Sequence, residues 1–598
     1  MNFIWLDINA SWSHSSLALP ALHANLSPDT AAACNMQVVR GTIKSTVAQI
    51  VQEVAQLEPS YIFATGWLFN INYLNEVLAR ISTLCSPQGV FLGGPEFLGD
   101  NSEFLRNHPF VTAVFKGEGE EMFEPFISSL LRGDSAWRSI EGFEYLLPDS
   151  SFEGASTDAA LITASNAWAS SFHSSSAVTV KNFKDIRCPE ESPLFSWDKS
   201  FVQIETSRGC FNSCRFCVSG IEKCPIQDIP IEGLRSRLEN ISARGIRQIR
   251  VLDRTFNGNP RRALQMLDLF KEFEGRLNFH LEVHPALLFP ANESEAVGKL
   301  REALMRMPAG LLHLEAGIQT LRQNVLNLCA RKGSCAQAVE GLKHLCGSSA
   351  FEVHADLIAG LPGYSYGQLV EDTLELMRIC PGEIQLESLK LLPGTWFRLN
   401  SVELGIRYSP LPPYEVLQTP AISYEELGKA MTLSKILDLW YNDEKWREPF
   451  CVIFAPATAG CCSDMNNRSQ CGQNVSAVSG APLLEQLIEE LHGTDYINQP
   501  LNLENKGILL YRFCCTHIPS LAPLVSLQWV RNGLSIKKEP AEMFVKWDFK
   551  SLLQNPLFVE NDPRYKYAYL EYDGVRHWFS FNKEVERVAP CNYFAKKI

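Results

Sequence analysis

Three cysteines, Cys210, Cys214 and Cys217, stand at C-x-x-x-C-x-x-C spacing just after an apolar run, Phe201–Ile204. A compact loop with this spacing can direct three thiolates at one centre, and thiolates suit iron–sulfur clusters and zinc. A structural zinc site needs four closed ligands. No fourth ligand stands at finger-like spacing, although Cys224 could serve. On a cubic four-iron cluster, three thiolates leave one iron open to a small chelating molecule. Incidental buried thiols are the less favoured alternative.

The segment Thr206–Gly220 resembles the cluster loop of the radical S-adenosylmethionine (radical SAM) enzymes. This resemblance implies that the three cysteines hold a [4Fe-4S] cluster whose open iron binds the amino and carboxylate groups of SAM. It implies reductive cleavage of SAM to a 5′-deoxyadenosyl radical. It also implies a partner that donates electrons, such as a flavodoxin or a ferredoxin.

The composition limits the class of protein. A chain of 598 residues is expected to form about three domains. Hydrophobic residues make up 46% and charged residues 20% of it, which is typical of a globular protein with sizeable cores. The net charge of −13 argues against a general nucleic-acid-binding surface, which would be basic.

The sequence also predicts the location of the protein. No apolar stretch reaches 18 residues, so we expect no transmembrane helix and no membrane partner. The start, Met1–Asp7, lacks a basic segment and is typical of a strand instead of a signal peptide. Eighteen cysteines without an export signal favour a reducing compartment, and we expect the cytoplasm.

Residues 1–132 alternate strand-like and helix-like runs. Strands are expected at Asn2–Ile8, Tyr61–Thr65, Val90–Leu92 and Val111–Phe115. Helices are expected at Ser16–Leu26, Lys44–Gln56, Ile71–Leu84 and Glu120–Leu131. This alternation predicts an α/β domain with a doubly wound, Rossmann-like parallel sheet. Ligands of such sheets bind at the carboxyl ends of the strands, where Gly66, Gly93 and Gly94 would let a ligand approach the backbone closely.

The turn Gly93–Glu96 and the segment Lys116–Glu120 resemble the cobalamin-binding domain that precedes the barrel in one branch of radical SAM enzymes. The resemblance implies that the glycine-lined edge binds cobalamin. The D-x-H-x-x-G loop of that family is not intact, because the corresponding segment Ser11–Leu17 keeps only His14. His14 is therefore either a cobalt ligand or, as we favour, a loop histidine that bonds the backbone.

Residues 201–395 contain six further strand–helix repeats, with the cysteine loop after the first strand. Strands are expected near Phe201–Glu205, Gln248–Asp253, Asn278–Val283, Leu311–Gly317, Phe351–Ile358 and Ile384–Leu391. These repeats predict an open (β/α)6 partial barrel of the radical SAM type. In βα barrels the chemistry takes place at the C-terminal ends of the strands.

The strand ends supply the residues expected to bind SAM. They are Asp253, Glu282, Glu315, Gln319, Gly360 and Gly363. Carboxylates there can accept hydrogen bonds from the ammonium and the ribose hydroxyls of SAM, and glycines let the backbone approach the adenine. The resemblance implies that the segment at Asp253 faces the methionine moiety and that Glu315 and Gln319 lie over the SAM pocket. For any single acid, a strand-end cap or an ion pair with Arg254 or Arg331 is an equal alternative.

Two regions carry weaker signals. Residues 133–200 are expected to form a linker, since Asp149–Ser176 is rich in Ser, Ala, Asn and Asp. Residues 396–598 are expected to form an α+β domain with a strong helix at Ser423–Trp440, and a role as lid or substrate platform over the barrel mouth is plausible. Its cysteines lack a standard ligand spacing, so free thiols are favoured over a second metal site; they are Cys451, Cys461, Cys462, Cys471, Cys514 and Cys515.

Both resemblances together predict a cobalamin-dependent radical SAM enzyme with an added C-terminal domain of unassigned function. The favoured reaction is methyl transfer to an unactivated carbon of a small-molecule or peptide substrate, in which one SAM methylates cobalamin and a second generates the radical. Radical rearrangement or ring contraction without methylation is an alternative. A non-catalytic cobalamin- or metal-binding sensor is an alternative of another class.

Overall fold

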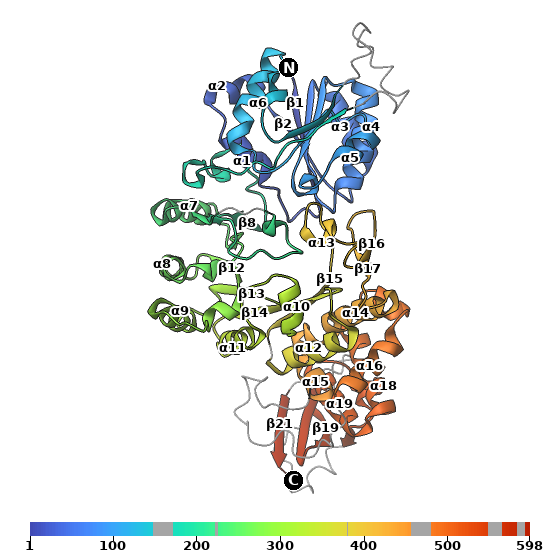
Figure 1. Ribbon diagram of the computed structural model, residues 1–598. Coiled ribbons are helices and arrows are strands. Elements are labelled where there is room, and N and C mark those ends of the chain that lie inside the picture. Colours follow the sequence, from blue (N-terminus) through green and yellow to red (C-terminus); the bar gives the residue numbers. More distant parts are fainter. Residues whose placement is uncertain are drawn as a thin grey trace.

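The computed structural model of the protein describes residues 1–147, 171–221, 225–379, 381–455, 480–547, 565–582 and 592–597. Three parts follow one another along the long axis of the molecule, from the N-terminal sheet domain through a second parallel sheet to C-terminal helices and a small sheet (Figure 1). This arrangement confirms the predicted α/β fold class. In these ranges, no helix is both long enough and apolar enough to cross a membrane.

The N-terminal sheet has the strand order β2-β1-β3-β4-β5-β6-β7, and its first five strands are parallel. Those five are β1 (Phe3–Asn9), β2 (Gln37–Thr42), β3 (Tyr61–Thr65), β4 (Gly89–Gly93) and β5 (Ala113–Phe115). The helices are α1 (Ala18–Ala24), α2 (Pro28–Cys34), α3 (Val47–Gln56), α4 (Ile71–Cys85), α5 (Ser102–Asn107) and α6 (Glu120–Arg132). One core lies between the sheet and α3 to α5, and a second lies between the sheet and α1, α2 and α6. Helices on both faces explain why β3 is buried along its whole length.

The sheet extends into the region expected to be a linker. Strands β6 (Phe143–Leu147) and β7 (Ser171–His173) add to it in antiparallel orientation, and Phe143 and Tyr145 pack in its core. Strands this short carry little periodicity, which is why the sequence did not predict them. Residues 148–170, which hold most of the Ser- and Ala-rich run, lie outside the described residues. The domain boundaries at 132, 200 and 395 stay predictions.

The second sheet is a six-stranded parallel sheet with the order β15-β14-β13-β12-β11-β8. Its strands are β8 (Phe201–Ile204), β11 (Gln248–Val251), β12 (Asn278–Val283), β13 (Leu312–Gln319), β14 (Glu352–Ala359) and β15 (Glu383–Ser388). Its main helices are α7 (Ile231–Ala243), α8 (Pro260–Lys271), α9 (Glu295–Met305), α10 (Gln323–Leu328), α11 (Cys335–Cys346) and α12 (Tyr366–Ile379). Burial alternates strictly along β13, so apolar side chains face the helices and polar ones face the barrel interior.

The C-terminal part covers the side of this sheet. Its helices are α14 (Tyr424–Ile436), α15 (Glu444–Phe454), α16 (Gly480–Leu491), α17 (Asp495–Asn498), α18 (Leu503–His517) and α19 (Ala522–Arg531). Its antiparallel sheet is β18 (Val545–Trp547), β19 (Tyr565–Tyr572), β20 (Val575–Asn582) and β21 (Asn592–Lys597). Helix α14 packs on the edge strand β15, and α16 packs on α12. These helices therefore cover a sheet edge, at the opposite end of the molecule from the N-terminal domain (Figure 1). That position does not fit the expected lid over the barrel mouth.

A shorter segment reaches back to the N-terminal domain. It contains α13 (Trp396–Leu399), β16 (Arg407–Tyr408) and β17 (Val416–Gln418). Between these two strands, the hydroxyl of Tyr414 donates a hydrogen bond to the buried carboxylate of Glu96. The segment therefore links the barrel to the loop that follows β4.

Candidate functional site

The cysteine loop starts directly after β8 and is anchored by Asp253. The carboxylate of Asp253 accepts hydrogen bonds from the backbone N–H of Thr206 at 2.7 Å and of Ser207 at 2.9 Å, and from the Thr206 hydroxyl. Burial raises the pKa of Asp253, and these hydrogen bonds oppose the rise. Asp253 was expected to face SAM, but both its oxygens are engaged by the loop. The structure indicates a supporting role for it instead.

The loop is also fixed from outside. The backbone N–H of Arg215 donates to the carbonyl of Cys329 at 3.0 Å, and that of Lys332 donates to the side chain of Asn212 at 3.0 Å. Burial raises the pKa of the Cys214 thiol, and the nearby Arg331 guanidinium opposes this. In the described chain no three ligating side chains converge on a position for a single metal ion. Three thiolates on one loop can each bind a different iron of a cubic cluster.

A cavity of about 180 Å³, here called the cluster cavity, opens beside the cysteines. It brings together six of the predicted residues, namely Cys210, Cys214, Cys217, Glu282, Glu315 and Gln319. Side chains that the sequence did not assign to SAM also line it, among them Arg254, His284, Arg331 and Asp356. These residues lie on or just after strands β8, β11, β12, β13 and β14, or in the loop after α10. The carboxyl ends of parallel strands therefore gather them at one edge, as expected.

Several polar atoms of the cluster cavity have no partner in the protein. The Oδ1 atom of Asp356 and both ring nitrogens of His284 are buried without a hydrogen bond. Burial, together with Glu315 and Glu282, raises the pKa of Asp356 well above its ordinary value. Burial and the Arg331 charge lower the pKa of His284 to about 3. Buried polar atoms without partners are costly, so this donor and acceptor set is typical of a site completed by a polar ligand.

Glu282 makes the cavity sensitive to pH. Burial, together with the nearby Glu315 carboxylate, raises the pKa of Glu282 to about 7. SAM is a sulfonium cation, and the carboxylate attracts it only when ionised. We therefore expect SAM affinity to rise up to about tenfold between about pH 6 and pH 8, since one pKa unit corresponds to about 1.4 kcal/mol. Isothermal titration across this range measures the effect. Glu282→Gln is expected to flatten the profile and the exposed Glu302→Gln to preserve it; an unchanged slope in Glu282→Gln would contradict this role.

Two predicted glycines lie away from the cluster cavity. Gly360 and Gly363 have φ values of 87° and 75°, which favour glycine. A side chain on Gly360 would approach Val416 and Leu427, and one on Gly363 would approach Leu328. Neither residue lines the cavity, so the structure gives them a role in the turn after β14, and their contact with adenine stays a prediction.

A layer of histidines lies beneath the acids and was missed by sequence reasoning. Nε2 of His313 and Nε2 of His354 are 2.7 Å apart, and Nε2 of His354 lies 2.8 Å from Glu383. His280 bonds Glu315 at 3.1 Å, and this hydrogen bond lowers the pKa of that carboxyl. The signal was present as H-x-E or H-x-D on three successive strands, which places both residues of each pair on the inner face.

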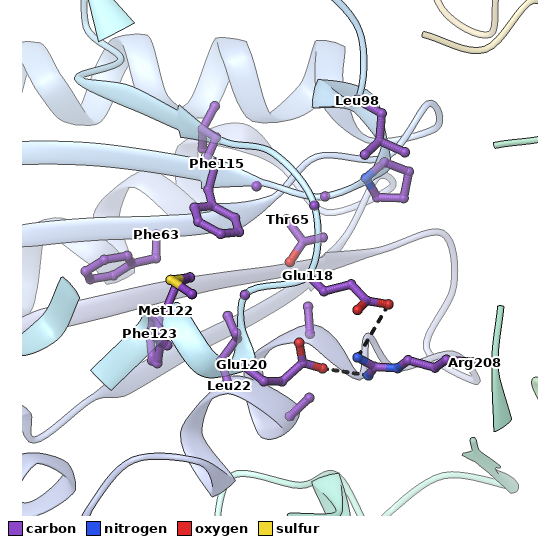
Figure 2. Close-up of a pocket in the computed structure, with 18 of the residues that line it drawn as sticks. Leu22, Phe63, Thr65, Leu98, Phe115, Glu118, Glu120, Met122, Phe123 and Arg208 are labelled. Carbon is purple, nitrogen blue, oxygen red and sulfur yellow. Dashed lines mark hydrogen bonds and ion pairs between the residues drawn. The ribbon is translucent and has the colours of Figure 1, made fainter. Parts of the chain in front are cut away.

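A second cavity of about 300 Å³ lies between the N-terminal domain and the cysteine loop, and is here called the interdomain cavity. Gly93 and Gly94 line its rim, together with Thr65, and its apolar wall includes Trp5, Phe63, Phe91, Phe115, Phe123 and Phe126. Figure 2 shows Phe63, Phe115, Met122 and Phe123 along one side of it. The described lining contains no histidine, cysteine or lysine.

The other two predicted cobalamin residues lie outside this lining. Gly66 supports the turn, because a side chain there would meet the Phe97 ring at 2.7 Å. His14 bonds the Ser11 hydroxyl at 2.8 Å and packs edge-on against Phe201. His14 is thus a loop histidine, although its partner is a side chain instead of the backbone, and its ligation of cobalt gains no support from the geometry.

Arg208, two residues before Cys210, joins the two domains. Its Nη2 atom lies 2.6 Å from Glu120 and 2.8 Å from Glu205, and its Nη1 atom lies 3.6 Å from Glu118 (Figure 2). Burial alone would lower the pKa of Arg208, but Glu120 and Glu205 raise it. This ion cluster fixes the rim of the interdomain cavity against the start of the cysteine loop.

Arg254 lines both cavities and marks where they meet. It follows Asp253 at the end of β11 and is exposed. A molecule in one cavity and a molecule in the other would therefore share this residue as a neighbour.

The C-terminal cysteines that the structure describes belong to no group of three side chains that could hold a metal ion. Cys514 is buried on α18, which raises the pKa of its thiol to about 12. Cys451 is buried on α15, and Cys515 is exposed. The ring of His517 lies against Glu490. Cys461, Cys462 and Cys471 lie outside the described residues.

Comparisons with known proteins identify the central domain. Residues 204–377 match the radical SAM superfamily, and residues 402–455 match a family described as a protein of unknown function, DUF4080. The first match confirms the predicted radical SAM domain. No curated protein matches the chain.

Two solved structures share the fold. One is the radical SAM methyltransferase TsrM from Kitasatospora setae with cobalamin and a [4Fe-4S] cluster bound, at a TM-score of 0.50 and 14% identity, over 68% of this chain and 79% of that one. The other is the cobalamin-dependent SAM radical enzyme OxsB with aqua-cobalamin and SAM bound, at a TM-score of 0.50 and 15% identity, over 90% of this chain and 74% of that one.

Proposed function

We propose that this chain, which contains a radical SAM domain at residues 204–377, is a cobalamin-dependent radical SAM enzyme that transfers a methyl group to an unactivated carbon. The observation that carries the proposal is the meeting of the cluster cavity and the interdomain cavity at Arg254. Two cofactors held in these cavities would lie on either side of one substrate. Proximity of this kind is the main contribution a protein makes to cofactor chemistry.

The cluster cavity fits a [4Fe-4S] cluster with SAM. Cys210, Cys214 and Cys217 would hold the cluster, and Arg331, whose guanidinium lies 3.9 Å from the Cys214 sulfur, would favour its thiolate. The unpartnered Asp356 oxygen and the Glu282 carboxylate offer acceptors to the ammonium and the ribose hydroxyls of SAM.

The interdomain cavity fits part of cobalamin. Its aromatic wall suits the flat apolar base of the nucleotide tail, and Gly93 and Gly94 at the rim leave room for the edge of the corrin ring. With the base held by this wall, it would be displaced from cobalt, and no histidine among the described lining residues would take its place. When bound, the cluster with SAM supplies a hydrogen-abstracting radical, and cobalamin supplies the methyl group.

The experiment that tests the function uses SAM with a labelled methyl group. The protein is reconstituted anaerobically with iron, sulfide and cobalamin, and reduced with dithionite. We expect formation of 5′-deoxyadenosine and methionine, S-adenosylhomocysteine from the methylation half-reaction, and label bound to cobalamin. Cleavage of SAM without transfer of label would favour rearrangement or ring contraction. Binding of cobalamin without any cleavage would favour a sensor, which the unpartnered acceptors of the cluster cavity argue against.

The placement of cobalamin in the interdomain cavity can be tested by measuring binding alone, without measuring activity. A side chain on Gly93 would approach nothing closer than the Phe115 carbonyl at 3.7 Å, so the fold tolerates Gly93→Val while the rim gains bulk. We expect cobalamin binding to weaken by about 1–3 kcal/mol, as for methyl groups added to a fitted site. Gly233→Val, on α7 with open space around it, is the control. Equal affinity of both variants, measured by absorbance titration, would contradict the placement.

The cobalt ligand has its own test. Because His14 does not line the interdomain cavity, we expect His14→Ala to leave the electron paramagnetic resonance of bound Co(II) unchanged. Nitrogen hyperfine splitting that disappears in this variant would show that His14 ligates cobalt.

The proposal also covers the substrate class, the electron donor and the cellular compartment of the enzyme. A small molecule or peptide is its substrate, and a flavodoxin or ferredoxin is its electron donor. A reducing compartment, the cytoplasm, suits a chain with eighteen cysteines.

A further inference from the structure

The interdomain cavity has an apolar end, formed by strands of the N-terminal sheet and by helix α6. Trp5, Phe63 and Phe91 stand opposite one another on β1, β3 and β4, and all three line the cavity. The ring centroids of Trp5 and Phe63 are 6.1 Å apart and those of Phe63 and Phe91 are 5.9 Å apart, with both pairs stacked. Met122 and Phe123 of α6 lie at the same end (Figure 2). A flat ring that enters this end would therefore meet aromatic side chains.

The polar side chains of the cavity lie at its other end, here called the mouth. Glu118, Glu120 and Arg208 form their ion cluster there (Figure 2). Thr65 is the last residue of β3, two residues after Phe63, which is a step of about 7 Å along the strand. The remaining polar lining residues follow strands β8 and β11 of the barrel; they are Glu205, Ser207 and Arg254. The register of the sheet therefore separates the aromatic level from the polar mouth.

Among the residues that the structure describes, the apolar end offers no free hydrogen-bond acceptor. Its side chains are apolar except for the indole nitrogen of Trp5, which is a donor and is buried. The backbone groups of β1, β3 and β4 pair with one another, and those of Met122 and Phe123 belong to helix α6. A ligand N–H group placed at this end would therefore lose its hydrogen bond to water without gaining another, which is costly.

We propose that the interdomain cavity selects its cobamide, the class of cofactor to which cobalamin belongs, by the base of the nucleotide tail: it binds a benzimidazole and disfavours adenine. This inference rests on the proposed function, because it assigns the apolar end to the base of a bound cobamide. Dimethylbenzimidazole, the base of cobalamin, has no N–H group once it is attached to its ribose, and its outer edge carries two methyl groups. Adenine carries an amino group with two N–H donors. At the apolar end that amino group would have no acceptor.

The test measures the binding of three corrinoids to the full-length protein by absorbance titration, without any catalytic step. They are cobalamin, adeninylcobamide, and cobinamide, which has the corrin ring but no base. We expect cobalamin to bind at least about tenfold more tightly than adeninylcobamide, because an unpaired buried donor costs about that factor in affinity. Cobinamide should also bind more weakly than cobalamin, since it leaves the apolar end empty.

Met122→Gln is designed to weaken this selection. The side chain keeps its length and gains an amide, which can accept from the adenine amino group and donate to the ring nitrogen beside it. We expect the ratio of the two affinities to fall at least about fivefold, the effect of a good amide–adenine pair. Met122→Leu is the apolar control at the same position and should keep the ratio. Equal cobinamide affinity in both variants would show that the fold and the corrin site persist.

The outcomes separate this inference from the proposed function. Equal affinity of the unmodified protein for cobalamin and adeninylcobamide would overturn the selection, and so would cobinamide that binds as tightly as cobalamin. An unchanged ratio in Met122→Gln would overturn the placement of the base at the apolar end. In all three cases cobalamin still binds, and the proposed function stands. Failure of the protein to bind any of the three corrinoids would overturn the proposed function itself.

Discussion

Replacing any one of Cys210, Cys214 and Cys217 with alanine is expected to abolish SAM cleavage and the visible absorption of the cluster. The loss should exceed about a hundredfold, because removing even an outer partner of a metal ligand costs 10- to 100-fold. The physical reason is that all three line one cavity and that no fourth cysteine of the residues described in the structure lines it with them. Iron and sulfide content, absorbance and 5′-deoxyadenosine formation measure the effect.

Cys329 provides the matched control. It is fully buried next to the loop, its carbonyl accepts from Arg215, and burial together with Cys214 raises the pKa of its thiol to about 12. A thiol held protonated is a poor iron ligand, so Cys329→Ala should keep the cluster and cleave SAM. A stable cluster of about four irons in the triple alanine variant, the content expected of a thiolate-held site, would disprove the assignment.

Arg208→Met is expected to weaken the contact between the N-terminal domain and the start of the cysteine loop. It leaves the carboxylates of Glu120 and Glu205 without the Arg208 cation, and Glu120 is only 6% exposed. Removing one partner from a buried ion pair typically costs about 3 kcal/mol or more. Hydrogen exchange should therefore accelerate in residues 116–120 and 205–209. Cobalamin-dependent methyl transfer should fall more than SAM cleavage, because the two cavities are no longer held together.

Two further variants serve as controls for the Arg208→Met experiment. Arg235→Met breaks an exposed pair with Glu272 and should change exchange little. Adding Glu120→Gln to Arg208→Met should restore part of the protection, since one unpaired charge is removed. Unchanged exchange at neutral pH would mean that the ion cluster does not hold the domains.

The sequence predicted most strands of the parallel sheets because buried strands and amphipathic helices leave strong periodic patterns, but it missed β2 (Gln37–Thr42), which pairs with β1 in the first sheet. Tyr61–Thr65 and Asn278–Val283 have the same bounds in prediction and structure. Strands β6 and β7 were missed because three to five residues carry little periodicity. Their pairing depends on the edge of a sheet formed earlier in the chain.

Site residues were predictable where strand direction alone determines their place. Glu282 and Glu315 stand opposite each other on the neighbouring parallel strands β12 and β13, so they lie together in the cluster cavity. Asp253 has the same type of position, but its side chain turns to the loop backbone, which spacing does not reveal. The sequence also did not indicate that Arg254 lines both cavities, because that position depends on how the two domains face each other.

The contacts that fix the cysteine loop from outside come from residues that are translated much later, and this bears on when the loop can fold. Asn212 and Phe211 are bonded by Lys332, 120 and 121 residues later in the chain, and Arg215 is bonded by Phe397. A ribosome releases the N-terminal domain well before these residues exist. We therefore expect the cluster loop to reach its final shape only after residue 397 has emerged, and stable iron insertion to follow synthesis of the whole barrel.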